Sequence, residues 1–210
     1  MKDEVSLAVS CSVIDPYRDN GGRDDWKTEI ASAYPELFDR PRGLPECGGG
    51  WKRLVYQACE EIREALRTDQ CNVIKLVVIK QSNGVLNILW EGALSARART
   101  EVERAIELAY MRSAETCEVC GYEGRLYSCD GWLHTACVGH GRGKLASWKR
   151  KASAVRVVRG TVGGRLQILS CRQYDRECNC FVEVSPDTLE IEIDELLAEY
   201  EPQRSPFFCF

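Results

Sequence analysis

The spacing of apolar residues predicts a helix followed by a β-hairpin in the first half of the chain. Between Trp51 and Leu66, apolar residues recur every three or four positions, as on one face of an amphipathic helix. Residues 73–80 and 85–90 are rich in apolar and β-branched residues, and Asn83-Gly84 between them is a strong signal for a two-residue hairpin turn. We therefore expect an amphipathic helix and then two antiparallel strands.

Other patterns flank this segment. Residues 5–13 alternate between apolar and polar or small residues, which predicts a strand with one buried face. Residues 26–34 are expected to form a short helix that a proline ends. Thr100 and Glu103 match a capping box, so a second amphipathic helix is predicted to begin there and to lead into a group of cysteines. The expected core is thus helix, hairpin and helix.

A second hairpin is predicted in the last third of the chain. Residues 155–162 and 165–170 have strand-like composition and are joined at Gly163-Gly164. Farther on, an apolar stripe over residues 189–200 fits a helix that Ser185-Pro186 would open, while the run LEIEI alternates like a strand. The pattern leaves both readings of this tail open.

The stretch from residue 117 to residue 140 holds six residues that could bind a metal ion. Cys117 and Cys120 form a C-x2-C pair, and Cys137 and His140 form a C-x2-H pair after sixteen intervening residues. Three thiolates and one imidazole in two closely spaced pairs are typical of tetrahedral zinc sites. We therefore predict that these four residues bind Zn2+.

The predicted zinc site is structural, because four protein ligands leave no coordination position for a reactive water. Gly121 and Gly139 are expected to give the ligand turns the backbone freedom they need. Cys129 and His134 also lie in this stretch, and either could replace one of the four ligands. An open site with His134 as a catalytic base is the enzymatic alternative, but the chain has only two histidines and no Gly-rich phosphate loop, so we expect no enzymatic activity.

Composition is that of a soluble globular protein. The 210 residues are 44% hydrophobic, enough to form one large domain or two small ones. No apolar run approaches the roughly 20 residues that cross a bilayer, and the start MKDEV lacks the basic and apolar parts of a signal peptide. We expect a cytoplasmic protein without membrane contact, whose twelve cysteines are zinc ligands and buried thiols rather than disulfides.

Charge is divided into two blocks along the last third of the chain. Residues 142–172 contain no acid and nine basic residues, so they could contact the phosphates of a nucleic acid or form a solvated face. Residues 175–201 contain ten acids and one arginine. Cys171, Cys178 and Cys180 lie where the two blocks meet and could contribute to a second metal site, although no fourth ligand has a familiar spacing.

Several of these segments together resemble an uncharacterised family of small zinc-binding proteins encoded by phages and prophages. The resemblance covers residues 34–142 and depends on PELF at 35–38, Gly50-Trp51, the hairpin, AIELAYMRSAETCEVCG and GWLHTACVGH. It favours Cys117, Cys120, Cys137 and His140 as ligands over Cys129 and His134. The hairpin turn KQSNG differs from the longer Lys- and Gly-rich turn of that family, and the last 65 residues have no counterpart in it. The resemblance implies a phage setting and a zinc site, and it implies no activity.

The sequence as a whole therefore predicts an α+β protein in three parts. These are an α+β domain at 1–114, a zinc-binding module at 115–145, and a basic hairpin with an acidic tail at 146–210. The expected function is non-enzymatic recognition of a host protein or protein complex, such as inhibition of a defence factor in the manner of anti-CRISPR proteins. The alternative is nucleic-acid binding through residues 142–172.

Overall fold

The computed structural model describes residues 25–39, 42–67, 73–146, 155–163, 165–175, 177–185 and 188. The chain divides into two compact units, residues 1–146 and 147–210, which are treated separately below. Helices and strands occur together, so the predicted α+β class is confirmed. The strand expected at 5–13, the tail at 189–200 that fits either a helix or a strand, and the acids beyond residue 185 lie outside the described residues.

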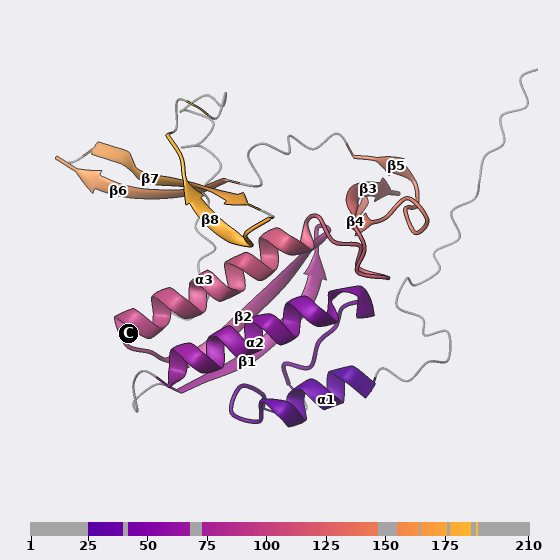
Figure 1. Ribbon diagram of the computed structural model, residues 1–210, viewed down its shortest axis with the longest axis horizontal. Coiled ribbons are helices and arrows are strands. Elements are labelled where there is room, and N and C mark those ends of the chain that lie inside the picture. Colours follow the sequence, from indigo (N-terminus) through magenta and orange to yellow (C-terminus); the bar gives the residue numbers. More distant parts are fainter. Residues whose placement is uncertain are drawn as a thin grey trace, which may run out of the picture. The chain divides into compact units, whose positions relative to one another are not determined.

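Two helices and a two-stranded sheet form the core of the first unit. A short 3-10 helix, η1 (Gly49–Trp51), leads into α2 (Lys52–Leu66), whose apolar face is buried as the periodicity predicts. The second helix, α3 (Ala96–Ser113), buries residues of its own apolar stripe. Figure 1 shows α2 and α3 side by side, with β1 and β2 behind them. Side chains from all four elements join one buried cluster.

The sheet is the hairpin that the sequence predicts, with one irregularity. Strand β1 (Val73–Ser82) pairs antiparallel with β2 (Val85–Ala93), and both turn residues, Asn83 and Gly84, have positive φ as a type I′ turn requires. Leu76 lies opposite Trp90 but Val78 lies opposite Leu89, so Val77 is an extra residue in β1. This bulge shifts the alternation by one residue. Its effect is that Ile74 and Leu76 before it and Ile79 after it all reach the core.

The predicted start of the second helix is wrong. Helix α3 begins at Ala96, and the side chain of Ser95 caps it by accepting a hydrogen bond from the Ala98 N–H at 3.3 Å. Thr100 lies inside the helix and donates its hydroxyl to the Ala96 carbonyl at 3.0 Å. The segment ARAR before Thr100 consists of strong helix formers, so the helix extends back to the nearest good cap.

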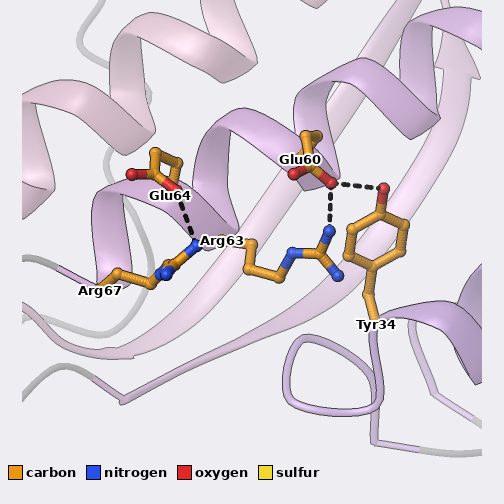
Figure 2. A network of polar contacts seen from close by, with 5 residues as sticks. All are labelled: Tyr34, Glu60, Arg63, Glu64 and Arg67. Carbon is orange, nitrogen blue, oxygen red and sulfur yellow. Dashed lines mark hydrogen bonds and ion pairs between the residues drawn. The ribbon is translucent and has the colours of Figure 1, made fainter.

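The first helix, α1 (Asp25–Ala33), joins the main core through Trp26, Ile30 and Ala31, and a group of polar contacts follows at its end. Figure 2 shows the Tyr34 hydroxyl donating to the Glu60 carboxylate at 3.0 Å, with Arg63 donating to the same carboxylate. The Arg63 guanidinium also lies over the Tyr34 ring at 4.5 Å. Burial and the neighbouring Glu60 raise the pKa of Tyr34 to about 12, so the phenol stays protonated and keeps donating. These contacts fasten the end of α1 to α2.

A small three-stranded sheet follows α3 in the first unit. Strands β3 (Arg125–Cys129), β4 (Trp132–Ala136) and β5 (Lys144–Leu145) pair in the order β4-β3-β5. No strand was predicted in this stretch, although Asp130-Gly131 is a hairpin signal, and both residues adopt positive φ in the tight turn. The Thr135 hydroxyl donates to the Gly84 carbonyl at 2.6 Å, which joins this sheet to the β1–β2 turn.

The second unit contains the predicted hairpin and one further strand. Strands β6 (Val155–Val162) and β7 (Arg165–Asp175) pair as expected, although β7 extends five residues beyond the predicted end at Ser170. The additional residues of β7 pair with β8 (Cys180–Glu183), giving the order β6-β7-β8. Cys171 is buried with Val157, Ile168 and Val184 in the small core of this sheet.

Candidate metal centre

Two tight turns carry the four predicted ligands, and each is closed by the same kind of backbone hydrogen bond. In the first turn, residues 117–121, the Gly121 N–H donates to the Cys117 carbonyl at 2.8 Å. In the second turn, residues 137–141, the Gly141 N–H donates to the Cys137 carbonyl at 2.7 Å. We call these the first and second knuckles. Each one folds the chain back so that its two ligand side chains point to the same side.

The glycine prediction holds for one knuckle only. Gly121 has φ +78°, which only glycine adopts without strain, so it ends the first knuckle as expected. Gly139 does not have positive φ, and a Cβ added there would meet only the Cys137 sulfur at 4.0 Å. The second knuckle therefore does not use the special freedom of Gly139.

The two knuckles bring Cys117, Cys120, Cys137 and His140 together. Their ligand atoms all lie within 4.8 Å of one another, close enough to bind one metal ion. The Cys120 and Cys137 sulfurs are 3.7 Å apart, and His140 Nδ1 lies 3.2 Å from the Cys137 sulfur and 3.7 Å from the Cys117 sulfur. This metal centre is the single such group of three or more ligands among the residues that the structure describes.

Two of the ligand thiols, Cys137 and Cys120, differ in pKa. Burial acts to raise the pKa of the Cys137 thiol, but hydrogen bonds from Cys120, His140 and Gly139 outweigh it and lower that pKa to about 7. Burial, followed by the neighbouring thiols of Cys117 and Cys137, raises the pKa of Cys120 to about 11. Without a metal ion, Cys137 is thus the first thiol of this pair to ionise.

Glu118, inside the first knuckle, ties the metal centre to the loop before α2. Its carboxylate accepts from the Gly48 N–H at 3.0 Å, and its carbonyl accepts from the Gly50 N–H at 2.7 Å. A Cβ on Gly50 would lie 2.3 Å from the Cys117 carbonyl oxygen, so this close approach requires glycine. Glu118 is buried, and sequence analysis gave no reason to select it.

Trp51 makes the second link between the core and the metal centre. Its ring is fully buried in the main core, and its indole N–H donates to the Thr116 carbonyl at 2.7 Å, directly before Cys117. On the other side, the Glu118 N–H donates to the Thr135 carbonyl of β4 at 3.0 Å. The metal centre therefore belongs to the same compact unit as the α2–α3 core.

Cys129 and His134, the two alternative ligands, lie on the β3–β4 hairpin and not in the metal centre. His134 stacks on Tyr127, and its Nε2 accepts from the Arg142 N–H at 3.2 Å. Burial, followed by the positive charge of Arg142, lowers the pKa of His134, so the neutral ring that can accept this hydrogen bond is favoured. Its position indicates that His134 supports the chain just after the second knuckle.

Cys171, Cys178 and Cys180 of the second unit do not form a ligand group among the described residues. Cys178 and Cys180 are joined by a disulfide in the turn between β7 and β8, with Cα atoms 5.4 Å apart. Cys171 is buried in the small core of the same sheet. The expectation that the cysteines beyond the zinc ligands are thiols is therefore wrong for this pair.

Three exposed apolar side chains adjoin the metal ligands in the sequence. Val119 and Val138 lie next to ligand cysteines in the chain and are 54% and 85% exposed, and Tyr122 just after the first knuckle is 76% exposed. We call these three residues the knuckle surface. Trp132 at the tip of the β3–β4 hairpin is also 76% exposed. A sequence-based search for ligands finds the cysteines but not this surface.

The predicted basic segment is described only in part. Arg142, Lys144 and Arg172 are exposed. Residues 149–151 lie outside the described residues, and the structure gives the backbone but not the side-chain environment of Arg156, Arg159 and Arg165. The phosphate-binding hypothesis for residues 142–172 therefore stays a prediction.

Comparisons with protein-family models, with curated proteins and with solved structures found no match to this chain. The family resemblance noted from the sequence thus remains a prediction. In the described part of the chain, no helix combines the length and the apolar character that crossing a membrane requires.

Proposed function

We propose that this chain is a non-enzymatic zinc-binding protein that recognises another protein through the surface around its metal centre. The observation that carries the proposal is the position of the knuckle surface, Val119, Tyr122 and Val138, directly beside the metal ligands. The cytoplasm is the proposed location, because a reducing compartment keeps the ligand thiols available for metal.

The ligand geometry supports zinc as the metal. Zinc binds thiolates at about 2.3 Å and imidazole at about 2.0–2.1 Å in a tetrahedron, which places neighbouring sulfurs about 3.8 Å apart. The Cys120 and Cys137 sulfurs are 3.7 Å apart, and His140 Nδ1 lies 3.2 Å and 3.7 Å from two sulfurs. Four protein ligands would fill this tetrahedron, so the zinc is proposed to be structural.

A structural zinc explains how apolar side chains can stay exposed in fixed positions. Exposed apolar groups are generally free to rearrange, and large exposed patches are uncommon on soluble monomers unless they bind something. Val119 and Val138 are each bonded in the chain to a ligand cysteine, so the ion would hold both of them in place. Apolar and aromatic anchors held rigidly in this way are typical of protein interfaces.

The partner that fits this surface is a protein with an apolar pocket. Because the sequence resembles a family encoded by phages, the proposed partner is a host protein or protein complex, such as a defence factor. The resemblance supports this last step, and the knuckle surface supports only the protein class.

The proposal can be tested with the full chain as bait in bacterial lysate treated with nuclease. A captured protein would be identified by mass spectrometry and its affinity measured again as a purified pair by calorimetry. Replacing Val119 and Val138 together by serine should weaken the Kd at least tenfold, about 1.4 kcal/mol, while the zinc content stays at one per chain. Cys120→Ser should abolish binding, because the surface loses its metal.

A matched control uses exposed apolar residues elsewhere in the same unit. Val73 and Leu89, on the β1–β2 hairpin, are 62% and 42% exposed, and their double serine variant should bind within about twofold of the original chain. Equal weakening in both double variants would mean that the knuckle surface is not the binding site. Loss of every captured protein on nuclease treatment would replace this proposal with nucleic-acid binding.

Nucleic-acid binding is the second candidate, because Arg142, Lys144 and Arg172 of the basic segment are exposed. Charge removal at Arg142 and Lys144 should then flatten the salt dependence of binding by about one unit of log–log slope per lost phosphate contact. Fluorescence anisotropy with a labelled oligonucleotide measures this slope. No binding of the intact chain at low salt would exclude this candidate.

A further inference from the structure

A disulfide with one residue between its cysteines lies at the turn from β7 to β8. Cys178 and Cys180 are bonded to each other, and Cys180 is the first residue of β8. We infer that this pair is a redox-active disulfide that exchanges with thiols, either small thiols of the glutathione class or exposed thiols of other proteins. This activity concerns the second unit and is independent of the function proposed for the metal centre.

The bond is too local to act mainly as a staple of the fold. A disulfide stabilises a protein mostly by closing a loop in the unfolded chain, and the effect falls as the loop becomes shorter. Here the sequence separation is two residues, which is close to the shortest loop that a disulfide can close. The bond between Cys178 and Cys180 therefore contributes little to the stability of the fold, so stabilisation does not explain why the two cysteines are paired.

Other contacts already shape the turn that carries the pair. The Asp175 carboxylate accepts from the Glu177 and Cys178 N–H groups at 2.8 and 3.4 Å. The Tyr174 hydroxyl donates to the Asn179 side-chain oxygen at 3.0 Å, and the Tyr174 ring meets Phe181 edge-on. Because these contacts do not involve the sulfur–sulfur bond, the turn can keep its shape when the bond opens. Two folded states, oxidised and reduced, are what a reversible redox pair needs.

The two cysteines differ in exposure, which assigns their roles. Cys178 is exposed, whereas Cys180 is half-buried at the start of β8. An incoming thiolate should therefore attack the Cys178 sulfur. The sulfur–sulfur bond then breaks, and Cys180 leaves as a thiolate that takes up a proton.

A second thiol completes the exchange. Its thiolate attacks the external sulfur of the mixed disulfide at Cys178, so the external disulfide leaves and Cys178 is released as a thiolate that is protonated. Two electrons pass from two external thiols to the protein disulfide, giving one external disulfide and the Cys178–Cys180 dithiol. The same steps in reverse close the bond with an oxidised thiol such as glutathione disulfide.

The experiment uses the full chain with zinc present in glutathione buffers of increasing ratio of reduced to oxidised form. Samples are quenched by alkylation and digested with trypsin, and the peptide 177–204 is weighed by mass spectrometry. Cleavage after Arg176 and Arg204 gives this peptide with Cys178 and Cys180 as its only cysteines. The reduced fraction should rise from a tenth to nine-tenths over about a hundredfold change in [GSH]²/[GSSG], as a two-electron exchange requires, and should reverse when glutathione disulfide is restored.

Single variants test the assigned roles. Cys178→Ser and Cys180→Ser should each lose the reversible pair, and the remaining Cys178 in Cys180→Ser should form its glutathione adduct several-fold faster than Cys180 does in Cys178→Ser. Cys171→Ser is the matched control in the same sheet, and its titration midpoint should stay within twofold of the original. Hydrogen exchange of β7 and β8 should be the same in both redox states.

Three results would overturn the inference, and a fourth would reject only the roles assigned to the two cysteines. A peptide that keeps its disulfide at every glutathione ratio would show an inert bond. A peptide that is doubly alkylated even in glutathione disulfide would show that the dithiol does not close. Loss of hydrogen-exchange protection in β7 and β8 on reduction would make the bond a structural staple. Equal adduct rates in the two single variants would reject the assigned attack at Cys178.

Discussion

Two regions of the first unit are held together in different ways. The core around β1 and β2 buries large apolar side chains such as Ile62, Ile79 and Leu86, and burial of this kind is the main stabilising contribution in folded proteins. The metal centre buries Cys117 but leaves Cys120 and His140 exposed, and its neighbours Val119 and Val138 face solvent. The core can form from burial alone, whereas we expect the metal centre to depend on a bound ion.

The contrast predicts which part of the first unit should lose its structure when the metal is removed. Glu118 and Trp51 link the two regions through hydrogen bonds to Gly48 and Thr116, so the metal centre is fastened to the core at one end. The knuckle surface lies on the metal side of these links. We therefore expect loss of zinc to release the knuckles while the helices and the β1–β2 hairpin stay folded.

The largest expected effect comes from removing a ligand. Cys120→Ser should lose the proposed zinc ion, because structural zinc in small modules contributes about 10–16 kcal/mol and three ligands would hold it much less tightly. Cys129→Ser, which changes a cysteine of β3 outside the metal centre, is the matched control and should keep one zinc per chain. Elemental analysis measures the metal, and hydrogen exchange compares residues 117–140 with residues 52–66.

Each outcome bears on the comparison of the two regions. Zinc loss in both variants would place Cys129 among the ligands. Loss of protection throughout α2 in Cys120→Ser would mean that the core also depends on the ion. If protein purified without chelator contains no metal, the proposal of a zinc centre is rejected.

A smaller loss of stability is expected when the hydrogen bond that links the two regions is removed. Glu118→Ala removes the buried carboxylate that accepts from the Gly48 N–H and should cost about 1–3 kcal/mol of unfolding free energy, as for other buried groups that lose their partner. Glu118→Gln keeps an acceptor oxygen and should cost less. Urea unfolding of the zinc-loaded protein measures both. Equal stability of Glu118→Ala and the original chain would show that the link does not couple the regions.

Burial patterns in the core were readable from the sequence because they are local and periodic. The face of α2 and the Asn83-Gly84 turn follow directly from residue spacing. The β3–β4 hairpin was not predicted although Asp130-Gly131 is a turn signal of the same kind, because its two strands are only five residues long and mostly half-buried, which leaves little alternation to detect. The start of α3 was misplaced because a consensus capping box competed with the propensity of the preceding ARAR segment.

The corrected helix start gives a third prediction, with a built-in control inside α3. Ser95→Ala removes the side chain that accepts from the Ala98 N–H and should cost about 1 kcal/mol. Thr100→Ala should be nearly neutral or slightly stabilising, because alanine is the better residue inside a helix. Thermal or urea unfolding compares the two. A larger loss of unfolding free energy in Thr100→Ala than in Ser95→Ala would support the capping box predicted from the sequence.

For the metal centre, the sequence predicts the ligand residues but not the contacts around them. The spacing of Cys117 and Cys120 and of Cys137 and His140 indicates which atoms could meet, because each pair closes a local turn. The contact between Glu118 and Gly48 spans 70 residues and has no local pattern. Exposure of the knuckle surface is likewise decided by tertiary packing, which periodicity does not describe.

The smallest predicted effect is a pH dependence at His134, beside the second knuckle. Its neutral Nε2 accepts from the Arg142 N–H, and its pKa in the folded protein lies below the ordinary value of 6.5. Below pH 6.5 the unfolded chain therefore binds more protons, so this contribution to stability is complete above pH 6.5 and is lost as pH falls through the lower folded pKa.

His134→Phe keeps a ring against Tyr127 but cannot titrate. Both proteins carry the same four ligands, so the difference between their unfolding free energies removes the pH dependence of the metal itself. That difference should decline modestly from pH 7.5 to pH 5.5, because the ring is only half-buried, and a constant difference would show that the His134 hydrogen bond does not depend on its protonation.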